Sequence, residues 1–304
     1  MSKAKKNAPE VATVRRAKNG TAITIFFTVL SVVWILPILL VLLNSFKRKA
    51  FIFRNPFGIS MVPMSKGWAA WSQGVKTCLV GLLNYKNAIA KTGFFRCFGY
   101  SLFITVGSVL VIVLCTSMTA WYVVRVKNTA TKIIYTLCLF SMIVPFQMVM
   151  FTLSKFANIL HLSNPLGIIV VYLGFGAGLA IFMFTGFVKS VPLEIEEAAM
   201  IDGCTPIQTY FQVVFPILRP TAITVAILEA MWVWNDYLLP SLVLNVNKYK
   251  TIPIAIQYLK QSHGQIDWGA MMAALVLSIL PIVIFYMAAQ KYIIEGVIAG
   301  AVKG

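Results

Sequence analysis

The chain has 304 residues, of which 59% are hydrophobic and only 12% are charged. Soluble domains carry about twice that share of charged residues, so the composition excludes an ordinary soluble protein and predicts a membrane protein. The formal net charge of +17 could indicate nucleic-acid binding, but the basic residues flank apolar stretches and line no single polar face. Anionic lipid head groups are therefore their expected partner, and nucleic acid is not.

Six apolar stretches are long enough to cross a membrane, since a helical span needs about 20 such residues. They cover residues 21–43, 99–124, 133–153, 166–188, 221–244 and 269–290. The first stretch is too long for a cleavable signal peptide and lacks a small-residue cleavage site. The sequence therefore predicts an all-α membrane protein with six transmembrane helices.

The N-terminal third is basic. Residues 1–20 form a polar tail that we expect to contact lipid head groups, and residues 21–98 combine the first span with a basic outer segment. No acidic residue lies between Lys47 and Arg96, while Trp68 and Trp71 indicate helices lying on the membrane surface. Two interpretations stay open, lipid contact or a basic face for a binding protein or an anionic substrate, and the pattern favours lipid contact.

Pro145 interrupts the third stretch and predicts a kink within one span. A proline at this depth frees a backbone carbonyl that protein or water must satisfy, so such kinks often line a cavity. Gln147 follows directly and is a candidate for the translocation path. A hydrogen bond between helices is an equally good explanation for this side chain.

Residues 191–220 form a polar island in the apolar second half, and we refer to them as the EAA segment. The segment holds four of the nine acidic residues, namely Glu194, Glu196, Glu197 and Asp202. We predict two short helices joined by a tight turn. Gly203 can adopt the left-handed conformation that ends the first, and Thr205 with Gln208 forms a capping box that starts the second.

The second of these helices is expected to be amphipathic and short. Pro216 and Pro220 are expected to end it. Its apolar side chains are spaced to share one face, and they are Ile207, Tyr210, Phe211 and Val214. A helix pair with one apolar face and exposed carboxylates would fit a cleft in another protein.

The fifth apolar stretch is the most polar. Glu229 and Asp236 are seven residues apart and therefore share one helix face. Carboxylates inside a membrane are costly and indicate a functional site by default. Aromatic faces and hydrogen-bonding groups suit sugar rings and hydroxyls, and this stretch supplies them through Trp232, Trp234, Asn235, Asp236 and Tyr237. Packing against a partner subunit is an equally good explanation.

The EAA segment resembles a known family. Glu197-Ala198-Ala199, then Gly203 three residues on, then Val213-Val214-Phe215-Pro216, resemble the EAA loop of binding-protein-dependent ABC importer permeases, with Phe215 in place of the usual Leu. Asp202 beside Gly203, the run from Trp234 to Asp236 and the C-terminal tail are similar to the carbohydrate branch. Within it, the chain most resembles the second subunit of maltose permease.

This resemblance implies an ABC importer type I (MetI-like) permease. Residues 99–290 would form a five-helix core that carries the EAA segment as coupling loop, and residues 291–304 would form a cytoplasmic tail. Its implied partners are a second permease subunit, two ATPase subunits and an extracytoplasmic solute-binding protein. The implied location is the plasma membrane of a prokaryote, with both termini in the cytoplasm. Charge alone does not decide this orientation, because the 26 basic residues divide equally between the two sides.

The resemblance also implies roles for individual residues. Coupling to the ATPase falls to Glu197, Ala198, Ala199, Asp202, Gly203, Phe215 and Pro216. The tail contact with the ATPase falls to Val302, Lys303 and Gly304. For the substrate path, the candidates are Gln147, Glu229, Trp232, Trp234, Asn235, Asp236 and Tyr237.

The sequence offers no catalytic site of its own. It contains no Gly-Lys dipeptide and hence no Walker A lysine, and it has two histidines and no metal-binding motif. We therefore expect no catalytic residue, metal or cofactor, with ATP bound by partner subunits. The alternative is an ion-coupled secondary transporter that uses Glu229 and Asp236, although the inverted repeat of many such folds is not visible.

Overall fold

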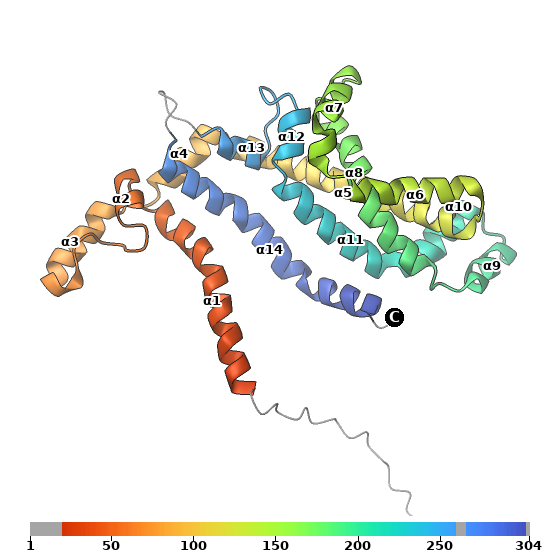
Figure 1. Ribbon diagram of the computed structural model, residues 1–304, viewed down its shortest axis with the longest axis horizontal. Coiled ribbons are helices and arrows are strands. Elements are labelled where there is room, and N and C mark those ends of the chain that lie inside the picture. The colour runs from red at the N-terminus through yellow and green to blue at the C-terminus, as the bar shows by residue number, and fades with distance from the viewer. Residues whose placement is uncertain (1–19, 260–265, 302–304) are drawn as a thin grey trace, which may run out of the picture.

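The computed structural model describes residues 20–259 and 266–301, with side chains described as far as residue 292, and these ranges are overwhelmingly helical (Figure 1). An isolated β-bridge joins Lys47 and Leu79. Five helices in the described ranges are long and apolar enough to cross a membrane, and a bent helix pair makes six if it counts as one span. The predicted all-α membrane fold is confirmed.

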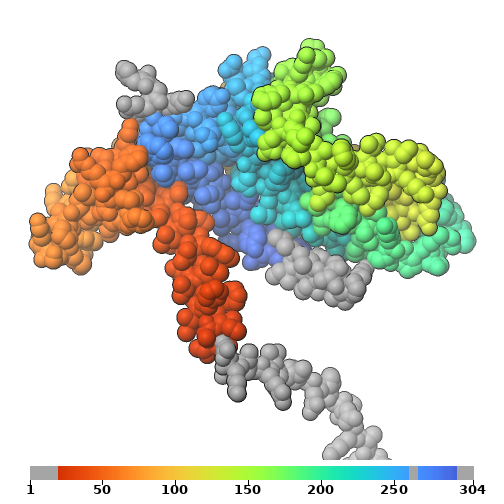
Figure 2. Space-filling view, in the orientation of Figure 1, coloured from red at the N-terminus to blue at the C-terminus, as the bar shows by residue number. Residues whose placement is uncertain are grey.

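Helix α1 (Gly20–Ser45) projects away from the rest of the molecule (Figure 2). None of its most apolar 18-residue stretch is buried, and only Asn44 and Ser45 in its last turn are. The helix continues through Pro37. A helix that is apolar on all sides needs lipid or protein around it, so α1 requires a membrane or a second subunit as its environment.

The outer segment is a set of short helices held to the end of α1. They are α2 (Lys49–Arg54), the 3₁₀ helix η1 (Met64–Lys66), α3 (Trp68–Cys78) and α4 (Leu83–Thr92). Lys47 is buried here, and its Nζ donates hydrogen bonds of 2.9 Å to the carbonyl oxygens of Asn55 and Pro56. Burial lowers the pKa of this lysine. Whether the segment contacts lipid stays a prediction.

Three long helices form the core: α5 (Phe94–Arg125), α8 (Pro165–Val188) and α11 (Phe215–Asn235). Two glycines on α8 allow close approach of neighbouring elements. A Cβ atom at Gly176 would lie 2.8 Å from Oε2 of Glu229, and one at Gly178 would lie 2.8 Å from the Cys138 carbonyl oxygen. No residue larger than glycine fits at either position without displacing a neighbour.

The third stretch, residues 133–153, is not one kinked span. It is divided between α6 (Thr129–Ile143) and α7 (Phe146–Ile159), which meet at an angle of 110°. Val144 and Pro145 are both extended at the break. Proline disfavours the helical conformation of the residue before it, so two consecutive residues leave the helix and the chain turns sharply.

A second, smaller hydrophobic cluster lies at the end of the bundle next to the outer segment. It joins Trp234 of α11 to α4, α13 (Ile252–Gln257) and α14 (Trp268–Ala301). Between α11 and α13, the helix α12 (Leu238–Val243) packs into the main core. An ion pair of 2.5 Å between Lys91 and Asp267 adds a polar link between α4 and the start of α14.

Candidate functional site

The EAA segment begins as the sequence predicts. Helix α9 (Leu193–Ile201) is followed by Gly203, whose φ of 89° lies in the left-handed region that favours glycine. Thr205 then caps α10 (Pro206–Gln208), and the capping box is present: the Thr205 N–H donates to Gln208 Oε1 at 2.8 Å, and the Gln208 N–H donates to Thr205 Oγ1. The two helices are therefore joined by a turn that local sequence specifies. The segment lies at the opposite extreme of the molecule from the outer segment (Figure 2).

The prediction that the second helix is short is wrong. From α10 the chain passes into a π-helical stretch, η2 (Thr209–Val214), and then directly into α11, which runs through Pro216 and Pro220 to Asn235. Pro216 falls in the first turn of α11, where a missing N–H is tolerated. The wider π turns before it also interrupt the regular hydrogen-bond pattern, so the proline adds little disruption. The EAA segment is consequently continuous with the fifth span.

The predicted single apolar face is divided in two. Tyr210 and Val214 are buried in the core, whereas Ile207 is 67% exposed and Phe211 is 46% exposed. Apolar side chains of α9 are exposed as well, among them Ile195, Met200 and Ile201. These apolar side chains of α9, α10 and η2 are therefore left exposed by the described chain, and we refer to them as the outward surface of the α9–α10 pair.

The acidic residues also divide. Glu194, Glu197 and Asp202 are exposed, as predicted. Glu196 is buried, with only 2% of its surface exposed. Its Oε1 accepts hydrogen bonds from Arg125 Nε at 2.9 Å and Nη2 at 2.6 Å, and its Oε2 accepts one from Trp121 Nε1 at 2.9 Å. The carboxylate faces α5 because α9 lies against the end of that helix, a contact between residues far apart in sequence.

The remaining coupling candidates also divide into exposed and buried residues. Ala198 is exposed, while Ala199 is buried on the same side of α9 as Glu196. Phe215 packs against the main core at the start of α11, next to Pro216. The tail residues Val302, Lys303 and Gly304 lie outside the described residues.

Glu229 and Asp236 both face α8, as their spacing predicts. Glu229 is buried next to Gly176, and within the described chain its Oε2 has no hydrogen-bond partner. Asp236 Oδ2 accepts a hydrogen bond of 3.1 Å from the Tyr172 hydroxyl. Asp236 Oδ1 accepts one of 2.9 Å from the Leu238 N–H at the start of α12.

The other fifth-span candidates do not converge on one point. Trp232 packs its ring against that of Tyr172, with centroids 5.4 Å apart. Trp234 points the other way, into the smaller cluster, where its Nε1 donates to the Ser278 carbonyl oxygen at 3.4 Å. Asn235 and Tyr237 are exposed. Gln147 is exposed on the first turn of α7. Within the part of the chain that the structure describes, they form no shared sugar pocket.

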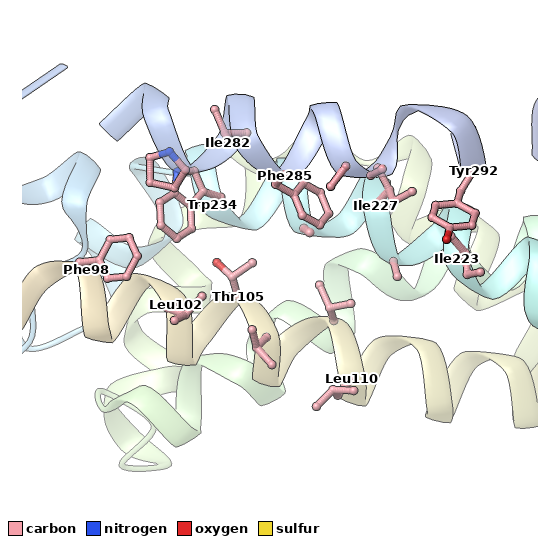
Figure 3. A pocket seen from close by; sticks show the side chains of 17 residues that line it. Phe98, Leu102, Thr105, Leu110, Ile223, Ile227, Trp234, Ile282, Phe285 and Tyr292 are labelled. Atoms are coloured by element: carbon pink, nitrogen blue, oxygen red, sulfur yellow. The ribbon is translucent and has the colours of Figure 1, made fainter. Parts of the chain in front are cut away.

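A cavity of about 520 Å³ lies between α5, α11 and α14 (Figure 3). Trp234 lines one end of it and Tyr292 the other, and Thr105 supplies a hydroxyl from α5. Apart from Thr105 and Tyr292 its lining side chains are hydrocarbon or aromatic, and Glu229 is not among them. Burying sugar hydroxyls without hydrogen-bond partners is costly, so this cavity does not suit a sugar.

Comparison with known proteins identifies the family. The model of the family described as "Binding-protein-dependent transport system inner membrane component" matches residues 112–298. The chain belongs to this family. The probable starch degradation products transport system permease protein AmyC of Thermoanaerobacterium thermosulfurigenes is 40% identical over 281 residues, which cover 92% of this chain and 96% of the relative.

Further relatives agree with this assignment. The multiple sugar-binding transport system permease protein MsmG of Streptococcus mutans serotype c is 32% identical over 283 residues, covering 92% of this chain and 95% of the relative. A chain from the crystal structure of a bacterial ABC transporter that imports the acidic polysaccharide alginate has a TM-score of 0.71 at 18% identity, covering 92% of this permease and 98% of that chain. The fold is that of an ABC importer permease.

Sequence reasoning missed Arg125 and Trp121 as partners of the EAA segment. Both lie on the last two turns of α5, about 70 residues before Glu196. The available signal was modest: a single Arg ends a span that carries no other charge after Arg96. Because a buried arginine requires a carboxylate, its partner could have been sought among the acidic residues of the EAA segment.

Proposed function

We propose that this permease is one transmembrane subunit of an ATP-driven sugar importer, that it forms part of the translocation path, and that it couples to a separate ATPase through the EAA segment. Its partners would be a second permease subunit, two ATPase subunits and an extracytoplasmic solute-binding protein. In this assembly the EAA segment and both termini are cytoplasmic, and the tail residues 302–304 contact the ATPase.

The observation that carries this proposal is the outward surface of the α9–α10 pair. It combines exposed apolar side chains with the exposed carboxylates of the coupling candidates Glu197 and Asp202. Large exposed apolar patches rimmed by polar groups are typical of sites where another protein docks. Because η2 and α11 continue from this pair without a break, a force applied there reaches the membrane-spanning core directly. A docked ATPase that moved the pair would bias the bundle between two states.

The proposed cargo is a sugar, because relatives that match nearly the whole chain carry starch-product and multiple-sugar transport names. We assign to the path those candidates that this chain leaves exposed or half-exposed, namely Gln147, Trp232, Asn235 and Tyr237. The buried candidates Glu229 and Trp234 and the half-buried Asp236 would then position the end of α11, which carries Trp232 and Asn235. The second permease subunit would supply the opposite wall.

The permease would bind no nucleotide or other cofactor itself, and ATP would be bound by the ATPase subunits. The test is reconstitution in liposomes with a candidate ATPase, second permease and binding protein from the same organism. We expect uptake of a labelled oligosaccharide that requires ATP and all the subunits. Uptake by the purified permease alone, without an ATPase, would overturn the proposal.

Glu197→Lys tests the docking surface in the same assay. Because the carboxylate is exposed at the centre of α9, we expect it to pair with a cation of the ATPase. Reversing its charge should lower ATP-dependent uptake by about tenfold or more, with ATPase co-purification reduced and membrane insertion unchanged. Glu194→Lys, which alters the same helix by the same charge, is the control and should lower uptake less. Equal losses in the two variants would argue against a specific role for Glu197.

A second candidate function is ion-coupled transport through Glu229 and Asp236. The unpaired buried oxygen of Glu229 favours it, because such a group can exchange a proton. Uptake that survives depletion of ATP but stops with a proton uncoupler would support this candidate. Uptake that survives the uncoupler and stops without ATP would exclude it.

A further inference from the structure

A single stripe on α5 receives both halves of the EAA segment. Ser117, Trp121 and Arg125 are spaced four residues apart and therefore lie above one another on the last turns of α5. Arg125 and Trp121 bind Glu196 of α9, as described above. Trp121 and Ser117 bind Tyr210 of η2: the ring centroids of Trp121 and Tyr210 are 5.4 Å apart, and the hydroxyl oxygens of Ser117 and Tyr210 are 2.6 Å apart.

The Arg125–Glu196 pair is the polar centre of this contact. The side chains are 19% and 3% exposed, and two guanidinium nitrogens donate to one carboxylate oxygen. Arg125 Nη2 also donates to the Val191 carbonyl oxygen at 3.0 Å, on the loop that enters α9. Removing one partner of a buried pair leaves an uncompensated charge, which is far more costly than losing a surface salt bridge. The α9 helix therefore does not separate from α5 without a large penalty.

The second half of the contact lies in the π-helical stretch. Tyr210 is fully buried, and its ring packs against Trp121 and against Phe215 at the start of α11. A π turn places side chains differently from an α turn, and such turns occur frequently at functional sites. Here the π-helical register accompanies an inward-facing Tyr210 and an outward-facing Phe211.

We infer that Arg125 and Glu196 are positioning residues for coupling: their ion pair makes α9 and the end of α5 one rigid body, so that movement of the EAA segment enters the bundle through α5. This inference rests on the proposed function, because it presumes an ATPase that moves α9. It assigns different tasks to two adjacent carboxylates. Glu197 meets the ATPase, whereas Glu196 transmits the movement to the permease's own core.

The experiment uses the complete importer in liposomes and compares Glu196→Gln with Glu194→Gln. Each substitution removes one negative charge from α9 and keeps the side-chain shape. For Glu196→Gln we expect normal ATPase co-purification and continued ATP hydrolysis, but about tenfold less sugar imported per ATP, within the range of typical coupling factors. Glu194→Gln should behave as the native chain does. Loss of ATPase binding in Glu196→Gln, or unchanged sugar imported per ATP, would overturn the inference.

Arg125→Lys provides a milder variant that keeps the charge but not the fork of donors. We expect it to retain partial coupling, between the native chain and Glu196→Gln. If Arg125→Lys couples as poorly as Glu196→Gln, the two guanidinium donors to Glu196 are needed for transmission. Full coupling in both variants would refute the role of the pair.

A distance measurement separates transmission from mere stability. Spin labels at the exposed positions Tyr122 on α5 and Met200 on α9, in a background without the five native cysteines, report their separation with and without ATP. We expect one unchanged distance in the otherwise native importer and an ATP-dependent change in Glu196→Gln. A distance that changes with ATP when Glu196 is intact would overturn the inference even if ATP-driven uptake, and with it the proposed function, is intact.

Discussion

The two ends of one continuous helix differ in how closely they follow their sequence. At the start, residues 203–208 form the turn and the capping box that local residue types predict. At the far end, the polar and aromatic side chains of residues 229–237 point to different neighbours and make no common pocket among the described residues. Capping is decided within one turn of helix, whereas a binding pocket is decided by which other helices surround it.

The largest effect should follow from changing the turn itself. Gly203→Pro cannot adopt the observed φ of 89°, because the proline ring restricts φ to about −65°. The angle between α9 and α10 must therefore change, and we expect ATP-dependent uptake to be lost. Membrane insertion should persist, because the candidate spans lie elsewhere in the chain.

Gly186→Ala on α8 is the matched control, since a Cβ there meets open space. This variant should import sugar at the native rate. Normal uptake by Gly203→Pro would instead mean that the left-handed turn does not set the geometry used in coupling.

Residues whose roles are local were predictable, and those whose roles depend on distant helices were not. Gly203, Thr205 and Gln208 act within the turn, and all three were predicted correctly. The burial of Glu196 required knowing that α9 lies on α5, which no local pattern encodes. The break at Pro145 was predicted as a bend only. The local rule disfavours a helical Val144 before the proline, but the 110° angle depends on the neighbours of both halves.

The next largest effect is expected on stability, at the C-terminal end of α11. Trp234 is 9% exposed and packs with Phe98, whereas Trp232 is 41% exposed and contacts Tyr172. Trp234→Ala should lower the free energy of unfolding by about 3 kcal/mol, as expected for removing a buried aromatic side chain. Trp232→Ala should lower it by about 1 kcal/mol, near the value of one aromatic pair.

Thermal unfolding of the purified importer in detergent measures both. A larger loss for Trp232→Ala than for Trp234→Ala would mean that Trp232, and not Trp234, is the structural member of the pair. The expected result, a larger loss for Trp234→Ala, would instead leave Trp232 available for the path and remove Trp234 from it.

The smallest effect should come from Asn235, and it decides whether this end of the helix meets sugar at all. Its side chain is exposed, and its Nδ2 donates to the Met231 carbonyl oxygen at 2.7 Å, which leaves the amide oxygen free to accept a hydrogen bond from a hydroxyl. Asn235→Ala should leave stability nearly unchanged and raise the sugar concentration needed for half-maximal uptake by about fivefold, since one hydrogen bond contributes about 1 kcal/mol. Asn247→Ala, an exposed amide on a loop outside the helix, should change neither quantity. Unchanged uptake kinetics in Asn235→Ala would assign this residue to contact with the second permease subunit, and the sugar would then bind mainly to that subunit.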